Sequence, residues 1–152
     1  LIHQHNAFSI AASWVGCKIH PMSRALRQAY QLPYNTPDHR LATLRFVQDI
    51  PLSPNDPAFE TLSKIEDQLA LFENTPMLIC WGMKDFVFDK DFLSVWEARF
   101  PQADVYRFLE GGHYILEDAS EEVIPLIESF LSGETMQPLA ERNDVSSQLS
   151  HS

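Results

Sequence analysis

Long apolar runs and an excess of basic residues are both missing from this sequence of 152 residues. A membrane-spanning helix needs about 20 consecutive apolar residues, and the longest candidates, such as residues 77–81, are only long enough for buried strands. The 11 Lys and Arg stand against 21 Asp and Glu, which gives a net charge of −10. Because a nucleic-acid binder needs a basic face that displaces counterions from phosphates, this charge argues against nucleic-acid partners. It equally disfavours docking on anionic lipid.

Cysteine is also rare, since the chain has only Cys17 and Cys80. Two cysteines exclude a disulfide framework and a cysteine-based zinc finger, and they suit a reducing compartment, for which we expect the cytoplasm. His3 and His5 have no carboxylate or cysteine at a suitable spacing beside them, so we expect no metal site and no other cofactor. Apolar residues make up 45% of the chain, which is enough to bury a core.

The first fifty residues are typical of helices joined by turns. Apolar residues recur at spacings of three and four over residues 5–19 and again over residues 22–30, which predicts two helices. Thr36 and Pro37 combine an N-cap with a proline at the first helical position and predict a third helix. We expect Arg40 on this helix to be solvated or paired with acidic side chains. Three prolines within residues 49–57 then predict a linker, because they exclude a continuous helix or a central strand.

Helices and strands alternate after this linker. The almost wholly apolar run of residues 77–82 predicts a strand buried on both faces, and residues 103–109 alternate as a second strand does. Helical patterns precede, separate and follow the two strands, and Asp89 is expected to cap the middle helix. Because strand–helix–strand crossovers are right-handed and parallel, this order predicts part of a parallel α/β sheet. From residue 132 the sequence is polar and predicts a disordered tail.

Two residues that could carry chemistry follow the ends of these strands. Asp85 comes just after Gly82, and His113 comes directly after Gly111 and Gly112. Taken singly, Asp85 is more often a turn or helix cap and His113 a surface-loop residue. Neighbouring strands lie about 4.8 Å apart, however, so the two side chains are expected to meet. A carboxylate that accepts one ring N–H fixes the histidine tautomer and leaves the other nitrogen as a base.

These motifs resemble the α/β-hydrolase fold, whose catalytic acid follows a late strand as W-G-x-x-D and whose histidine follows the last strand as G-H with E-D behind it. Residues 81–85 (W-G-M-K-D) and 112–118 (G-H-Y-I-L-E-D) match both patterns in the family's order. Residues 85–88 and the helical stretch before the linker are similar to the haloalkane dehalogenase-like branch, with its epoxide hydrolases and β-lactone decarboxylases.

The resemblance implies an α/β fold class and a domain organisation. We expect the C-terminal part of an α/β-hydrolase fold, with its last two parallel strands and flanking helices, preceded by a helical cap. The cap would comprise residues 1–50 and the hydrolase core residues 51–131, with residues 132–152 as the disordered tail.

The resemblance also implies an activity. In this branch a nucleophile, usually an Asp on a strand-to-helix elbow, forms a covalent ester with a small, mostly apolar substrate: a haloalkane, epoxide, β-lactone or ester. His113 would activate the water that hydrolyses the ester, and Asp85 would orient His113 and stabilise its imidazolium. Phe86, Phe88 and Tyr114 flank this pair and are candidates for the pocket lining, with core packing as the alternative for all three. Of these, Phe86 and Tyr114 are expected to bind the substrate.

One element of the family pattern is missing from the sequence. The five glycines, at positions 16, 82, 111, 112 and 133, do not frame a nucleophile as G-x-[Ser/Asp/Cys]-x-G. Since the chain also opens on Leu1 rather than Met, we expect the C-terminal half of an enzyme, inactive alone, whose partner is the N-terminal half of the same enzyme. The alternative is a non-catalytic α/β-hydrolase-like module that acts by interaction with another chain.

Overall fold

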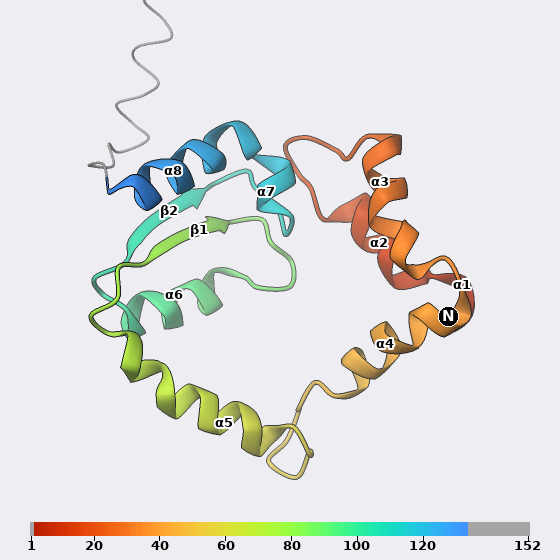
Figure 1. Cartoon of the computed structure of the whole chain (residues 1–152), viewed down its shortest axis with the longest axis horizontal. Coiled ribbons are helices and arrows are strands. Elements are labelled where there is room, and N and C mark those ends of the chain that lie inside the picture. Colours follow the sequence, from red (N-terminus) through yellow and green to blue (C-terminus); the bar gives the residue numbers. More distant parts are fainter. Residues whose placement is uncertain (1, 134–152) are drawn as a thin grey trace, which may run out of the picture. The chain divides into compact units, whose positions relative to one another are not determined.

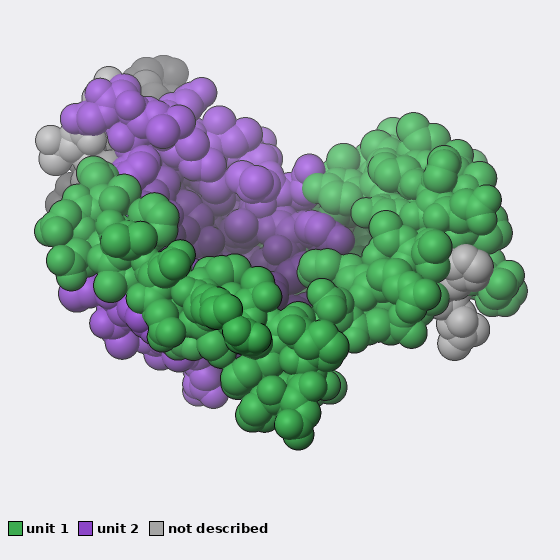
Figure 2. Space-filling model, turned by 60° about the horizontal axis from the view of Figure 1, so that its bottom comes forward, with its two compact units in different colours: residues 1–76 green, residues 77–152 purple. Residues whose placement is uncertain are grey.

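The protein is described by a computed structural model that covers residues 2–133, with residues 2 and 3 described by their backbone alone. The chain forms two compact units, residues 1–76 and residues 77–152, which Figure 1 draws as ribbons and Figure 2 distinguishes by colour. The expected division into a cap over residues 1–50 and a core over 51–131 stays a prediction, and the predicted tail lies, from residue 134 on, outside the described part. Over the described residues, we find no helix with the length and apolar character that crossing a lipid bilayer requires.

Within the described residues, the first unit is built from helices. They are α1 (Ile2–His5), α2 (Ala7–Val15), α3 (Arg24–Gln31), the 3-10 helix η1 (Leu32–Tyr34), α4 (Pro37–Gln48), α5 (Phe59–Gln68) and the 3-10 helix η2 (Leu69–Phe72). The predicted cap of α4 is confirmed: the Thr36 side chain accepts a hydrogen bond from the His39 N–H at 3.3 Å, and Pro37 opens the helix. Such a cap satisfies one of the backbone donors that the start of a helix leaves unpaired.

A helix is confirmed within residues 5–19, but it spans only Ala7–Val15, so the predicted bounds are too wide at both ends. Asn6 has a left-handed backbone conformation with φ 51°, and this residue separates α1 from α2. Asn tolerates this conformation better than most residues because its short polar side chain hydrogen-bonds locally. Here its side-chain oxygen accepts from the Ser9 hydroxyl, and its carbonyl accepts from the Ile10 N–H at 3.1 Å. The apolar residues that indicated the helix begin at Phe8, after this break, and Ile19 lies beyond the end of α2.

Arg40 is buried, so the prediction of a solvated arginine is wrong, whereas pairing with an acidic side chain stays a prediction. Its side chain is 7% exposed and donates to the carbonyl of Tyr34 at 2.8 Å and to that of Gln4 at 3.1 Å. Both carbonyls belong to the last turns of short helices, where backbone acceptors have no partner within the helix. The guanidinium therefore ties the ends of α1 and η1 to α4.

The proline-rich linker is held in a turn by a single carboxylate. Oδ2 of Asp56 accepts the N–H groups of Leu52 and Ser53, each at 2.7 Å. These hydrogen bonds stabilise the charged carboxylate and lower the pKa of Asp56. The linker between α4 and α5 thus has a defined local structure although its prolines exclude a helix.

The second unit contains the two predicted strands in the predicted parallel arrangement. Its elements are β1 (Leu78–Gly82), α6 (Lys90–Arg99), β2 (Asp104–Phe108), α7 (Ile115–Asp118) and α8 (Ser120–Ser132). The two strands pair from Leu78 with Asp104 to Gly82 with Phe108. In Figure 1, α6 and α8 lie on either side of this pair. The strand ends that carry Asp85 and His113 are therefore at the same edge of the sheet.

Large apolar side chains from both helices anchor the second unit. Leu93 and Phe100, in and after α6, and Val123 and Leu126 of α8 are at most 2% exposed. Burying side chains of this size stabilises a fold by about 1.5–3 kcal/mol each. Asp89 caps α6 as predicted, because its carboxylate accepts the Asp91 N–H at 2.9 Å. The expectation that β1 is buried on both faces is not met over Leu78–Trp81, which are half-buried. Within the described residues this strand has one neighbour, β2.

Candidate active site

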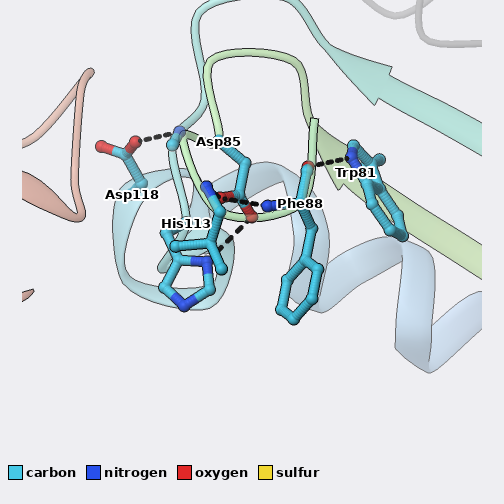
Figure 3. A network of polar contacts seen from close by, with 7 residues as sticks. Trp81, Asp85, Phe88, His113 and Asp118 are labelled. Atoms are coloured by element: carbon cyan, nitrogen blue, oxygen red, sulfur yellow. Dashed lines mark hydrogen bonds and ion pairs between the residues drawn. The ribbon is translucent and has the colours of Figure 1, made fainter. Parts of the chain in front are cut away.

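Asp85 lies in the turn that follows β1, and both of its carboxylate oxygens are engaged. Its N–H donates to the carbonyl of Gly82 at 3.1 Å, and Oδ1 accepts the N–H groups of Val87 at 2.7 Å and Phe88 at 3.1 Å. This half of the carboxylate does what a turn-capping Asp does. The second oxygen, Oδ2, points toward His113 (Figure 3).

His113 reaches Asp85 from the loop that follows β2. Its Nδ1 lies 2.9 Å from Oδ2 of Asp85, and the two side chains are 28% and 10% exposed, respectively. Since an ionised carboxylate only accepts hydrogen bonds, Nδ1 is the donor and Nε2 is left as the acceptor nitrogen of a neutral ring. The structure thus brings together the two residues that the sequence predicts as acid and base.

The two loops approach each other so closely that only glycine fits between them. A Cβ atom on Gly82 would lie 2.2 Å from the carbonyl oxygen of Gly112 and 2.7 Å from that of Gly111. Backbone hydrogen bonds hold this approach: Met83 N–H to the Phe108 carbonyl at 2.9 Å, and Lys84 N–H to the Gly111 carbonyl at 2.8 Å. The glycine of the W-G-M-K-D motif is therefore required by the docking of the histidine loop.

A cavity of about 290 Å³ lies beside the pair. It is lined by Cys80, Trp81, Gly82, Asp85, Phe88, Gly112, His113 and Ile115. Trp81 Nε1 donates to the carbonyl of Phe88 at 3.0 Å (Figure 3), and this hydrogen bond fixes the backbone of Phe88 at the wall of the cavity. Burial raises the pKa of the Cys80 thiol, which keeps it protonated and uncharged. A mostly apolar wall with one acid–base pair suits a small apolar molecule.

The aromatic residues around the imidazole divide into two groups. The ring centroids of Phe86 and Tyr114 lie 6.0 Å and 5.4 Å from that of His113, so both predicted substrate-binding residues pack against the base. Phe88, at 5.8 Å, also lines the cavity. Its place in the F-V-F segment after Asp85 already makes it a candidate for the pocket lining. Substrate contact by Phe86 and Tyr114 stays a prediction.

Asp118 is a further site-associated residue that sequence reasoning missed. Its side chain is fully buried at 0% exposure, and its Oδ2 accepts the Gly112 N–H at 2.8 Å. It belongs to the E-D pair behind the G-H motif, which is the signal that could have identified it.

The first unit holds a larger cavity of about 540 Å³ between α4 and α5. Its lining consists of Phe46, Asp49, Ile50, Pro51, Pro57, Ala58, Thr61 and Leu62. Asp49 is its only titratable lining residue, so this cavity lacks an acid–base pair and is not the candidate site. Nowhere in residues 2–133, as far as their side chains are described, do three or more His, Cys, Asp or Glu residues gather to hold a metal ion.

Two relatives are both named cis-3-alkyl-4-alkyloxetan-2-one decarboxylase. The protein from Shewanella oneidensis is 52% identical over 132 residues, which are 87% of this chain and 42% of that protein. The protein from Xanthomonas campestris pv. campestris is 44% identical over 130 residues, which are 86% of this chain and 43% of that protein. The chain thus spans less than half the length of these relatives.

Solved structures show the same fold. A loop variant of a haloalkane dehalogenase from Bradyrhizobium elkanii matches with a TM-score of 0.74 at 24% identity, over 87% of this chain and 43% of that one. A haloalkane dehalogenase from Agrobacterium tumefaciens C58 matches with a TM-score of 0.70 at 21% identity, over 86% of this chain and 45% of that one.

The matches confirm the resemblance stated from the two strand-end motifs. An oxetan-2-one is a β-lactone, so the relatives and the solved structures carry two of the names expected for this branch. The alpha/beta hydrolase fold family itself matches residues 6–120, most of the chain and all of the site described above. The chain therefore belongs to the alpha/beta hydrolase fold family.

Proposed function

We propose that this chain supplies the acid and the base of an α/β-hydrolase-fold active site that acts on a small apolar β-lactone. The observation that carries the proposal is the 2.9 Å contact between His113 Nδ1 and Asp85 Oδ2 at the wall of a largely apolar cavity. The names of the relatives favour a 3,4-dialkyloxetan-2-one over the haloalkane, epoxide and ester alternatives.

The residues have distinct roles in this proposal. Asp85 keeps the hydrogen on Nδ1 of His113, so Nε2 takes a proton from water or substrate, and the carboxylate stabilises the imidazolium that forms. Loss of CO2 from the lactone breaks the C2–C3 and O1–C4 bonds and leaves an alkene between C3 and C4. No proton is gained or lost overall, so a proton that Nε2 takes up is returned within the same turnover. No metal is needed for this proton transfer.

The nucleophile belongs to another segment of polypeptide in this proposal. The sequence has no G-x-[Ser/Asp/Cys]-x-G elbow, and an acid and base without a nucleophile and an oxyanion hole leave little catalysis. We therefore expect no turnover by the 152-residue chain alone, and we expect its partner to be the N-terminal half of such an enzyme. The cytoplasm remains our prediction for its location, on the low cysteine content.

A chimaera tests this function. In the Shewanella oneidensis relative, the segment that aligns with this chain is exchanged for the chain, and alkene formation from a cis-3-alkyl-4-alkyloxetan-2-one is followed by gas chromatography. We expect turnover that falls by about 10⁴-fold in Asp85→Asn and His113→Ala variants. The matched control is His39→Ala, which removes an exposed histidine of the first unit and leaves the rate unchanged.

Two results would contradict the proposal. One is turnover that survives His113→Ala. The other is a folded chimaera that binds the lactone but does not convert it. That result would favour the alternative, a non-catalytic module that acts by interaction, to which the missing elbow motif points.

A further inference from the structure

We infer that Asp118 is a positioning residue that sets the backbone on both sides of His113 and thereby holds the imidazole in register with Asp85. This inference deepens the proposed function of the same site. The hydrogen bonds of Asp118 described below join it to the backbone on both sides of His113, so it acts through the chain that carries His113.

Two hydrogen bonds from the one residue flank the histidine. The Asp118 carboxylate accepts the N–H of Gly112, the residue before His113, at 2.8 Å. The Asp118 backbone N–H donates to the carbonyl of Tyr114, the residue after His113, also at 2.8 Å. Figure 3 shows the Asp118 carboxylate hydrogen-bonded to the backbone of the loop that carries His113. The Tyr114 carbonyl also accepts the Glu117 N–H at 3.0 Å, so the bond that depends on the Asp118 side chain is the one to Gly112.

The burial of Asp118 makes this contact strong and costly to lose. Its side chain is 0% exposed, and a carboxylate is rarely buried this fully unless it is paired. A hydrogen bond to a charged acceptor is shorter and roughly twice as strong as a neutral one. Removing the carboxylate would leave the Gly112 N–H, which is itself buried, without its acceptor.

The other link between the two loops has a different character. Lys84 pairs with Glu110 across the site, but these side chains are 50% and 69% exposed. Exposed ion pairs of this kind contribute little, since water and salt screen them. Lys84→Ala is therefore a control that loosens the same loops without touching the residues that flank His113.

The test is nitrogen-15 NMR of the His113 ring in the full 152-residue chain, because the shift of each ring nitrogen reports which one carries hydrogen. We expect Asp118→Ala to abolish the hydrogen-bonded Nδ1–H signal. Asp118→Asn retains an oxygen acceptor and is expected to retain the signal. The controls Lys84→Ala and Glu128→Gln are expected to retain it too. Glu128→Gln removes one exposed carboxylate from α8 and so matches the loss of charge.

The outcomes are decisive in either direction. An Asp118→Ala chain that keeps the amide spectrum of β1 and β2 and also keeps the Nδ1–H signal overturns the inference. Equal loss of the signal in the Ala and Asn variants also overturns it, because the effect then depends on charge and not on position. If Asp118→Ala does not fold, the Gly112 amide of the unaltered chain decides: slow hydrogen exchange supports the inference, and exchange as fast as in a solvated loop overturns it. These readouts need no turnover, so they stand apart from the proposed function.

Discussion

The Asp85 carboxylate divides its two oxygens between its own loop and His113. Oδ1 accepts two N–H groups of the turn that follows β1, and Oδ2 lies 2.9 Å from Nδ1 of His113. The turn-capping role and the acid role are therefore compatible in one side chain. The turn bonds hold the carboxylate in the orientation in which Oδ2 meets His113, as a triad acid has to be held.

Gly82→Ala tests whether the close approach of the two loops is required. The added methyl group would lie 2.2 Å from the Gly112 carbonyl oxygen, a backbone atom that cannot move without shifting His113. We expect a loss of about 2–3 kcal/mol in the free energy of unfolding, measured by urea denaturation, together with separation of His113 from Asp85.

The matched control for this substitution is Gly133→Ala. Gly133 has φ +70° and nothing within 4 Å of an added Cβ, so the variant isolates the effect of backbone conformation from that of contact. We expect a smaller loss of about 1 kcal/mol from the left-handed conformation. Equal stability of the Gly82→Ala chain and the unaltered chain would show that the loops do not dock as described.

Cys80 makes stability depend on pH at the alkaline end. Burial raises its pKa, so the unfolded chain releases the thiol proton first, from about pH 8.5 upward, while the folded chain keeps it. The contribution of the Cys80 thiol to the free energy of unfolding is therefore complete below this pH. It falls as the pH rises, by less than about 1.4 kcal/mol per pH unit. The check is urea denaturation between pH 8 and pH 9.5. Cys80→Ser should remove this slope, and an identical slope in both chains would refute the assignment.

Asp56 makes the linker sensitive to acid. Its pKa is lowered by the N–H groups of Leu52 and Ser53. The stability that the charged carboxylate gives to the linker turn is therefore complete above about pH 3.9 and is lost as the pH falls through its lower folded pKa. Asp56→Ala should increase the rate of limited proteolysis within residues 49–57 at neutral pH. Asp49→Ala is the control within the same segment and should leave the rate unchanged. Equal cleavage of all three chains would show that the Asp56 contacts do not order the linker.

The strands and the meeting of Asp85 with His113 were predictable because local signals specify them. Residues 77–82 are apolar throughout, and Asp85 and His113 follow the ends of strands that a short crossover makes neighbours. The family motif then confirmed what the spacing indicated. Parallel pairing places both side chains at one edge of the sheet, so their meeting needs no further tertiary information.

Other features depend on tertiary packing and were not predictable. Arg40 and Asp118 are charged residues in polar contexts, and only the helices and loops packed around them make them buried. Asn6 separates α1 from α2 through a left-handed backbone conformation that the spacing of apolar side chains does not indicate. Backbone groups are among the partners of Arg40 and Asp118, and a sequence pattern of side chains does not show where backbone acceptors and donors are left to be satisfied.

The central claim is that Asp85 holds His113 as a base with hydrogen on Nδ1. Nitrogen-15 NMR of the two ring nitrogens in the 152-residue chain, at a pH where the ring is neutral, tests this claim directly. The account predicts hydrogen on Nδ1 and none on Nε2, with a shift toward the Nε2–H form in Asp85→Asn, since the amide presents a donor to Nδ1. Hydrogen on Nε2 in the unaltered chain, or a ring that does not respond to Asp85→Asn, would contradict it.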